Sequence, residues 1–346
     1  MKKVHEMNKI LHAHYTALYL TKTKKVLETN KVKNISIMRF THFHKEPTYV
    51  CGIEHCVQFL QKVQGVFKVY GVKDGDLVPA GKPILVIEGD YSKIAEYESV
   101  IDGILARESS VCNHTKRILK YIKPSQLICM ADRADLYLAQ PYDGYAAWIG
   151  GMRTFTTKGH VELIPNMSGV KVVGTMPHAL IQQFNGNLNK ALWAYHKTFP
   201  NEKLSALIDY HDDVVGDIKK IDKQLRPLLT SIRIDTSIRM CDKSLPNKKE
   251  NYGVCKQLVI NARKALDAND MKHVNIIVSS GFTCKKIKEF VKAKVPADFY
   301  GVGASLLKVN VNITGDLVYL NNRPEAKTGR EVKIDHKDLN KLNIYI

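Results

Sequence analysis

The sequence lacks the features that would place a chain in a membrane or outside the cell. Its apolar stretches all fall short of the about 20 consecutive residues that a helix needs to span a bilayer. The basic segment 1–10 leads into residues that include His and Tyr, where a signal peptide would have an apolar centre. We therefore expect a soluble, cytoplasmic protein with no membrane partner.

Cysteine is also sparse for its length. The chain has 7 cysteines, an odd number, and only Cys51 and Cys56 lie close together in the sequence. This spacing forms neither a disulfide framework nor the paired CxxC pattern of a structural zinc site. We expect reduced thiols that are mostly packed in the interior.

Acidic residues are few relative to basic ones. The counts are 34 Asp and Glu against 52 Lys and Arg, which gives a formal net charge of +18. Such a chain can bind nucleic acid or a small polyanionic substrate. The lysines are scattered along the polar faces of apparent helices, without the interleaved aromatic residues of a single-strand binder. Solvated helix faces account for these charges, so we disfavour nucleic acid as the main partner.

The first part of the chain has strand-and-turn character. With 346 residues, 45% of them hydrophobic, the chain can bury a large core in one or two domains. Between about 60 and 90, short apolar segments alternate with turns such as KDGD at 73–76. The segment 75–89 is also typical of biotinyl and lipoyl carriers, but it lacks a lysine at a hairpin tip. We interpret it as structural.

Beyond a helical stretch from about Ala95 to Tyr121, strand and helix patterns alternate. Apolar or β-branched strand candidates occupy 127–132, 169–175, 204–210, 231–235 and 274–280, with a last one near 300. About six such repeats favour parallel βαβ units in a β/α barrel, complete or incomplete. After Val309 the strand-and-turn character returns, and we expect this tail to pack on the N-terminal domain. The predicted domains are 1–108 with 310–346, and a barrel over 109–309.

Two glycine-rich turns follow the last two predicted strands. Ser279, Ser280 and Gly281 end one strand, and Gly301 and Gly303 end the next. Glycines let backbone N–H groups converge on an anion, and a helix that follows adds its dipole. A single turn of this kind is as consistent with a tight turn as with ligand binding. Two in succession predict a phosphate site.

Charged residues follow the two strands before these turns. IDYHDD (208–213) contains Asp209, and SIRIDTS (231–237) contains Arg233 and Asp235. Carboxylates at strand ends can hold Mg²⁺ or ribose hydroxyls, and arginine can neutralise phosphate. The structural alternative is helix capping by Asp212 or Thr236, which is compatible with function.

The early barrel strands contribute a further set of polar candidates. A lone histidine is more often structural, but one that directly follows a strand is a candidate for chemistry. The candidates from this part of the chain are Arg133, Gly151, Thr156, Thr175 and His178.

Taken in order, these segments resemble nicotinate phosphoribosyltransferase, a type II phosphoribosyltransferase, over nearly the whole chain. The segments that carry the resemblance are ALYLTKT (17–23), CGIEHCVQFL (51–60), YESVIDGILARESS (97–110), DGYAAWIGG (143–151), VVGTMPHALIQ (172–182), LIDYHDD (207–213), IRIDTS (232–237), SSGF (279–282), YGVGASL (300–306) and RPEAKTGR (323–330).

The resemblance implies a fold and a reaction. The fold is an irregular β/α barrel with an N-terminal α/β sandwich-like domain, and the active sites are shared across a homodimer. The reaction joins nicotinate to phosphoribosyl pyrophosphate, releasing nicotinate mononucleotide and pyrophosphate. It is usually coupled to ATP hydrolysis through a phosphorylated histidine, whose position is held here by His178.

Roles follow for the predicted site residues. Arg133 and Arg233 are assigned to anionic groups of the substrates, Asp235 to the ribose or to Mg²⁺, and the two glycine turns to the 5′-phosphate. Tyr19 matches an aromatic residue that stacks on the pyridine ring in the neighbouring subunit. Asp209, Gly151, Thr156 and Thr175 complete the predicted substrate-binding set.

The sequence departs from the family pattern at two places, and alternatives remain. Ala17 stands where the family often has aspartate, and MADRADLY (130–137) lacks a second arginine that relatives carry. The nearest alternative is quinolinate phosphoribosyltransferase, whose arginine–lysine–threonine motif is missing here. Nicotinamide as acceptor and a non-catalytic, nucleic-acid-binding scaffold are the other readings. The ordered series of polar strand ends argues against a scaffold.

Overall fold

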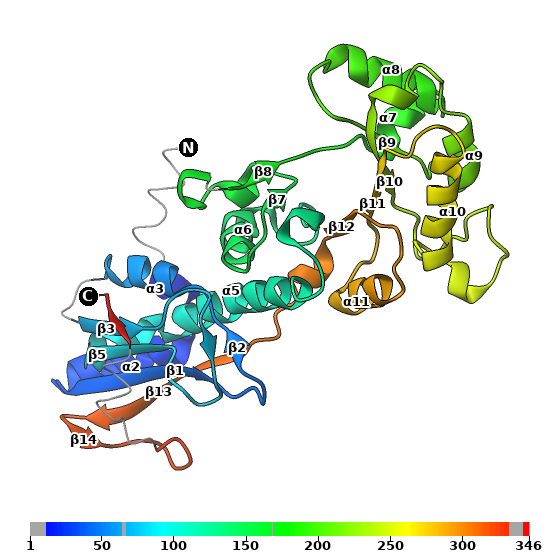
Figure 1. Ribbon diagram of the computed structural model, residues 1–346. Coiled ribbons are helices and arrows are strands. Elements are labelled where there is room, and N and C mark those ends of the chain that lie inside the picture. The colour runs from blue at the N-terminus through cyan, green and yellow to red at the C-terminus, as the bar shows by residue number, and fades with distance from the viewer. Residues whose placement is uncertain (1–11, 64–66, 168, 332–341, 346) are drawn as a thin grey trace. The chain divides into compact units, whose positions relative to one another are not determined.

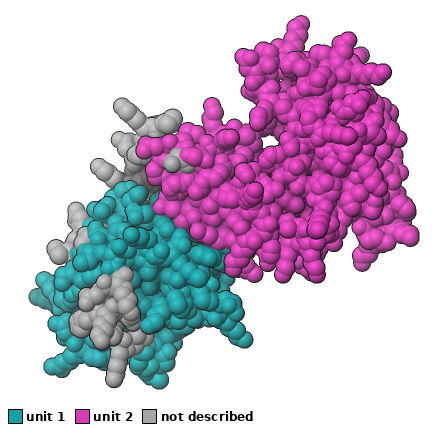
Figure 2. All heavy atoms as spheres, in the orientation of Figure 1, with its two compact units in different colours: residues 1–113, 308–346 teal, residues 114–307 magenta. Residues whose placement is uncertain are grey.

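The computed structural model describes residues 12–63, 67–167, 169–331 and 342–345. The basic segment at 1–10 and part of the C-terminal tail therefore lie outside the described residues. The chain divides into two compact units, one made of residues 1–113 and 308–346 and the other of residues 114–307 (Figure 2). Within the described ranges, no helix has the length and apolarity to cross a membrane.

Unit 1 is built on a six-stranded antiparallel sheet (Figure 1). Strand β1 lies inside this sheet and pairs with β13 on one side and β5 on the other. The tail thus supplies a central pairing rather than a loose extension. In sheet order the strands are β14 (Arg323–Pro324), β13 (Ile313–Leu320), β1 (Ile35–His42), β5 (Leu85–Asp90), β3 (Phe67–Gly71) and β15 (Asn343–Ile344); β2 (Thr48–Tyr49) and β4 (Leu77–Val78) pair separately.

Helices pack against this sheet through apolar side chains. Phe40, Ile87, Ile101 and Leu105 are fully buried members of the shared core. Close packing requires glycine at Gly315, where a Cβ would lie 2.6 Å from the Met38 side chain. The helices of unit 1 are η1 (His12–Tyr15), α2 (Leu18–Thr29), α3 (Ile53–Leu60), α4 (Tyr91–Ile94), η2 (Ala95–Tyr97) and α5 (Glu98–Ile118), whose last residues belong to unit 2.

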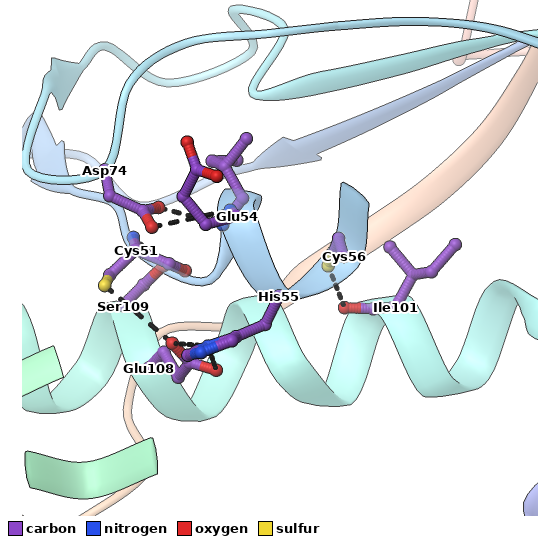
Figure 3. Close-up of polar contacts among 9 residues, drawn as sticks. Cys51, Glu54, His55, Cys56, Asp74, Ile101, Glu108 and Ser109 are labelled. Carbon is purple, nitrogen blue, oxygen red and sulfur yellow. Dashed lines mark hydrogen bonds and ion pairs between the residues drawn. The ribbon is translucent and has the colours of Figure 1, made fainter. Parts of the chain in front are cut away.

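A buried polar cluster joins α3 to α5 within unit 1 (Figure 3). The His55 Nδ1 atom lies 2.8 Å from Glu108 Oε1, and the Ser109 hydroxyl accepts a hydrogen bond from the Cys51 N–H at 3.0 Å. Asp74 accepts the first backbone N–H of α3, from Ile53, at 2.8 Å. Asp74 therefore caps a helix whose preceding residue, a glycine, has no side chain for this purpose.

Unit 2 contains a curled parallel sheet of seven strands. Every strand pair in it is parallel, and within the described residues no pairing joins β8 to β9, so the half-barrel is open at that seam. The predicted fold class is confirmed. The order is β8 (Lys171–Val172), β7 (Thr154–Phe155), β6 (Leu127–Cys129), β12 (Phe299–Val302), β11 (Asn275–Val278), β10 (Leu229–Ile234) and β9 (Leu204–Leu207).

Helices alternate with these strands along the chain, as a parallel sheet requires. Helix α10 shows why they form: its apolar residues Leu258, Val259, Ala262 and Leu266 are buried on one face. The helices of unit 2 are η3 (Pro124–Gln126), η4 (Tyr137–Ala139), α6 (Gln140–Ile149), η5 (Gly159–Val161), η6 (Pro165–Met167), α7 (His178–Gln183), α8 (Leu188–Thr198), α9 (Val214–Lys219), η7 (Arg226–Leu228), η8 (Lys249–Asn251), α10 (Lys256–Asp267), α11 (Cys284–Lys292) and η9 (Ala304–Leu306).

The strands are shorter than the sequence pattern indicates. The pattern predicts a strand over 169–175, but β8 covers only Lys171 and Val172, and Val173 is exposed. Its neighbour β7 is equally short, and the sheet is open on the far side of β8. β-branched residues are enriched in strands, but a strand lasts only as long as its hydrogen-bonding partner.

Candidate functional site

The candidate site lies at the carboxyl ends of the strands in unit 2. Because the strands are parallel, their ends reach the same edge of the sheet, where ligands bind in folds of this type. Continued ladder bonds carry the chain past the strands: the Ile208 N–H donates to the Arg233 carbonyl at 3.2 Å, and the Ser279 N–H donates to the Ile234 carbonyl at 3.0 Å. The residues after β9, β10 and β11 are thereby held next to one another.

A continuous series of hydrogen bonds joins four predicted site residues. The His178 Nε2 atom lies 3.1 Å from Asp209 Oδ1, and the Asp235 N–H donates to Asp209 Oδ2 at 3.1 Å. The Ser279 hydroxyl donates to Asp235 Oδ1 at 2.7 Å. Residues that are far apart in the sequence therefore meet at one place, as the strand-end reading predicts.

The electrostatic environment of His178 favours its charged form. Its hydrogen bond to Asp209 raises the pKa of His178, and the charges of Asp209 and Asp235 add to this effect against burial and the charge of Arg233. Arg233 itself is only partly satisfied: its Nη2 donates to the Met176 carbonyl at 3.4 Å, while its Nε is buried without a partner.

His178 is placed by a segment that crosses the open seam of the sheet. Pro177 is extended and precedes the first residue of α7, which is His178. The seam-crossing contacts are the Arg233 bond to Met176 and the His178 bond to Asp209. The chain after the short strand β8 is thus tied to β9 and β10 by side chains rather than by a backbone ladder.

The two glycine turns lie side by side. The Ser305 hydroxyl donates to the Phe282 carbonyl at 2.8 Å and joins the turns directly. Ser280 and Gly281 both have positive φ, of 65° and 70°, a conformation that favours glycine. At Gly303 a Cβ would lie 2.6 Å from the Met130 carbonyl oxygen, so only glycine fits beside the end of β6.

The other glycine of this turn, Gly301, also permits a close approach. A Cβ there would lie 2.4 Å from the Met130 sulfur and 3.1 Å from the Ser279 Cβ. The ends of β6, β11 and β12 are therefore packed as closely as backbones allow. Exposed backbone at such a place can approach an anion closely.

The early strand ends contribute less uniformly. Arg133 is exposed and makes no hydrogen bond or ion pair with a described residue, and the Thr156 hydroxyl donates to the Cys129 carbonyl at 2.9 Å. Thr175 is half-buried between β8 and α7. Gly151 lies before β7, at the amino edge of the sheet, and its φ of 107° accounts for glycine without a ligand.

Tyr19 belongs to unit 1. It lies in the first turn of α2, with 64% of its surface exposed, and Ala17 occupies the N-cap without a side-chain hydrogen bond. The structure therefore gives Tyr19 no packing role in the described part of the unit. An exposed aromatic ring is what stacking on a substrate of another subunit would require.

Capping around the site differs from the prediction. Helix α9 is capped by Asp213, which accepts from the Gly216 N–H, and not by Asp212. The predicted exposed loop 241–251 is anchored by Asp242, which is fully buried and accepts from the Val214 N–H at 2.8 Å. A charged residue in a charged stretch gave no indication of this burial.

Sequence reasoning also missed several polar residues at this edge. Ser305 joins the glycine turns, while Gln140, Thr157 and His160 form a hydrogen-bonded series beside β6 and β7. Thr157 and His160 follow Thr156 within a polar segment directly after a strand, which was the available indication. As for metals, the described residues contain no group of three or more His, Cys, Asp or Glu side chains arranged to hold an ion.

Comparisons with known proteins agree with this architecture. Residues 26–109 match the family model of the quinolinate phosphoribosyl transferase N-terminal domain. The structure of a nicotinate-nucleotide pyrophosphorylase from Pyrococcus furiosus superposes with a TM-score of 0.80 at 26% identity, covering 94% of this chain and 79% of that one. Human nicotinic acid phosphoribosyltransferase gives a TM-score of 0.68 at 14% identity, covering 90% and 76%.

Two curated relatives come from Mycobacterium tuberculosis (strain ATCC 25618 / H37Rv). Nicotinate phosphoribosyltransferase pncB1 is 24% identical over 272 residues, and nicotinate phosphoribosyltransferase pncB2 is 26% identical over 155 residues. The alignments cover 76% and 44% of this chain, but only 55% and 29% of the relatives. The chain belongs to the type II phosphoribosyltransferase family. It spans about half the length of the first of these relatives.

Proposed function

We propose that this chain is a nicotinate phosphoribosyltransferase of NAD salvage, which forms nicotinate mononucleotide and pyrophosphate from nicotinate and phosphoribosyl pyrophosphate. The observation that carries the proposal is the hydrogen-bonded series from His178 through Asp209 and Asp235 to Ser279, which ends at the joined glycine turns. The names of the curated relatives support nicotinate as the acceptor.

The site chemistry suits this transfer. As pyrophosphate leaves, positive charge develops on the ribose C1 and negative charge on the leaving group. In our assignment the turns at 279–281 and 301–305 hold the 5′-phosphate, Asp235 binds the ribose, and Arg133 and Arg233 bind anionic groups. These side chains orient the reactants and stabilise charge, and no protein nucleophile is needed toward the sugar.

His178 is the proposed site of ATP coupling. Its Nε2–H donates to Asp209, which leaves the Nδ1 lone pair as the nucleophilic atom of the neutral imidazole. Attack of Nδ1 on the terminal phosphorus of ATP forms the N–P bond as ADP departs. Asp209 stabilises the positive charge that the ring gains in this step.

Mg²⁺ is the proposed cofactor, and the carboxylates present fit a shared site. Mg²⁺ is commonly held by one or two protein carboxylates together with substrate phosphates. Asp235 uses Oδ1 for the Ser279 hydroxyl, so its second oxygen is the ligand that we assign to the ion. When bound, Mg²⁺ would neutralise pyrophosphate charge.

A second copy of the chain is the proposed protein partner. Leu136, Tyr137 and Leu138 are consecutive, and between 58% and 69% of each is exposed, with Tyr142 nearby in α6. Exposed apolar groups of this kind mark interaction surfaces. We assign them to a homodimer, and Tyr137→Glu should shift the mass measured by light scattering from dimer to monomer, whereas Tyr195→Glu should not.

The function is tested by offering phosphoribosyl pyrophosphate and Mg²⁺ with nicotinate, quinolinate or nicotinamide, each with and without ATP. We expect nicotinate mononucleotide from nicotinate alone, and faster with ATP. His178→Ala should retain slow synthesis but consume no ATP per product formed. ATP consumption in step with product in that variant would sink the phosphohistidine assignment.

Quinolinate is the alternative acceptor. The family model matched at 26–109 is named for quinolinate phosphoribosyl transferase, which is the observation that favours it. That reaction would release carbon dioxide along with pyrophosphate. Carbon dioxide release from quinolinate, without product from nicotinate, would replace our proposal with this one.

A further inference from the structure

A chain of hydrogen bonds runs across the carboxyl ends of β6 and β7. The His160 Nδ1 atom lies 2.6 Å from Thr157 Oγ1, and the Thr157 hydroxyl donates to Gln140 Oε1 at 2.8 Å. The Gln140 amide in turn donates to the Asp132 carbonyl at 2.9 Å. The chain therefore connects η5 to the turn after β6 through the first residue of α6.

The donors in this chain have only one consistent arrangement. The Thr157 hydroxyl has a single hydrogen, which goes to Gln140, so the imidazole must donate from Nδ1. The His160 backbone N–H, 3.2 Å from the same oxygen, is a second donor to it. Burial lowers the pKa of His160, against the charges of Asp143 and Asp132, so the ring is neutral at physiological pH.

This arrangement leaves a cost at the other ring nitrogen. In the neutral ring with Nδ1 protonated, Nε2 is an acceptor, and it is buried with no hydrogen-bond partner. An unsatisfied buried acceptor destabilises a fold, and an apolar residue would avoid it. Packing alone therefore does not explain a histidine at position 160.

The surroundings hold the imidazole in place. Its ring stacks on Phe155 with centroids 6.1 Å apart, and His160 is fully buried. At Gly144 a Cβ would lie 1.7 Å from the His160 carbonyl oxygen, and at Gly159 it would lie 2.8 Å from Gln140 Oε1. Glycine at both positions lets α6 and η5 approach closely enough to form the hydrogen bonds.

The far end of the chain is the turn that carries Arg133. Its guanidinium is exposed and makes no hydrogen bond or ion pair with a described residue, so its donors are available to an anion. We propose that His160 is a positioning residue that fixes, through Thr157 and Gln140, the turn that presents Arg133 to the pyrophosphate group of the substrate. This inference rests on the proposed function.

The test removes the relay at two separate positions. His160→Leu and Thr157→Val delete the donor or the linking hydroxyl, whereas His160→Asn and Thr157→Ser keep a donor near Nδ1 or keep the hydroxyl. The readouts are steady-state kinetics, calorimetric binding of inorganic pyrophosphate with Mg²⁺, and hydrogen exchange of peptides covering 131–136. Thermal unfolding confirms that each variant is folded.

We expect His160→Leu and Thr157→Val to raise the KM for phosphoribosyl pyrophosphate and the Kd for pyrophosphate by about tenfold. Their kcat and the KM for nicotinate should change less than about twofold, and exchange at 131–136 should speed up. The two conservative variants should restore pyrophosphate binding. Adding His160→Leu to Arg133→Gln should have no further effect on the Kd, because both act through the same contact.

Two results would overturn the inference: Thr157→Val, folded, with unchanged pyrophosphate affinity, or additive effects of His160→Leu and Arg133→Gln. Absence of pyrophosphate binding by the wild-type chain would overturn it too. If the wild type binds pyrophosphate but makes no mononucleotide from any acceptor, the proposed function fails. The binding comparison still decides the role of His160 in that case.

Discussion

At the scale of single residues, Asp209 controls the protonation of His178. We expect Asp209→Asn to keep the shape of the contact but remove its charge, so the pKa of His178 should fall, because the hydrogen bond to the carboxylate is the largest effect that raises it. Product formed per ATP should also drop, by at least about tenfold, if the imidazole is the coupling group. NMR titration of the histidine ring and product assays measure the two effects.

The matched control for this prediction is Asp217→Asn. Asp217 pairs with His211, whose Nδ1 lies 2.9 Å from its Oδ2. The variant removes a carboxylate of the same kind from a neighbouring histidine, and we expect the titration of His178 to stay unchanged. An equal fall in the His178 pKa in both variants would mean that general charge, rather than the Asp209 contact, sets it.

The His55–Glu108 pair in unit 1 predicts a pH-dependent contribution to stability (Figure 3). Burial lowers the pKa of His55, but its hydrogen bond and charge interaction with Glu108 raise it further, and the net pKa is above the ordinary value. A raised folded-state pKa stabilises the fold below the unfolded value of about 6.5, and the effect is lost as pH rises through the folded value.

We therefore expect His55→Leu to reduce the free energy of unfolding by about 3 kcal/mol at pH 6, because Glu108 stays buried without this partner. The deficit should narrow at pH 9. Denaturant unfolding at both pH values measures it, with the exposed His273→Leu as a control of little effect. A deficit that grows with pH would contradict the assignment.

At the scale of elements, the contact between α6 and η5 depends on Gly144. A Cβ there would lie 1.7 Å from the His160 carbonyl oxygen, which belongs to the backbone and cannot yield cheaply. We expect Gly144→Ala to lower the free energy of unfolding by about 3 kcal/mol or to prevent folding. Gly103→Ala is the control: it also lies within a helix, nothing lies within 4 Å of its Cβ, and alanine should stabilise that helix by about 0.5–1 kcal/mol. Equal unfolding midpoints of the two variants would contradict the packing.

The sequence predicts elements well where periodicity reflects burial. The helical face of Leu258, Ala262, Ala265 and Leu266 is buried in α10 as expected. The strand at 169–175 is overestimated because the extent of β8 is set by its short neighbour β7, which local sequence does not reveal.

Site residues divide in a similar way. Those that directly follow buried strands, such as Asp209, Asp235 and Ser279, could be grouped from sequence because parallel strands end at one edge. His160 and Ser305 could not, since their importance comes from contacts made with segments that only the fold brings near.

At the scale of the whole molecule, the tail completes unit 1. Strand β13 pairs with β1 over Ser36 to His42, and Val311 and Ile313 are part of the same core as Phe40. A chain ending at Leu307 should expose one side of β1 and lose protection of β1 amides in hydrogen exchange. A chain ending at Glu331 keeps β13 and β14 and should retain that protection. Equal protection in both truncated chains would show that β13 is dispensable.

The central claim is that a phosphoribosyl group binds at the carboxyl edge of the seven-strand sheet. A crystal structure with phosphoribosyl pyrophosphate and Mg²⁺ tests it most directly. We predict the 5′-phosphate against the turns at 279–281 and 301–305, with the ribose hydroxyls at Asp235. A sugar phosphate bound away from these turns, or no binding at millimolar concentration, would contradict the account.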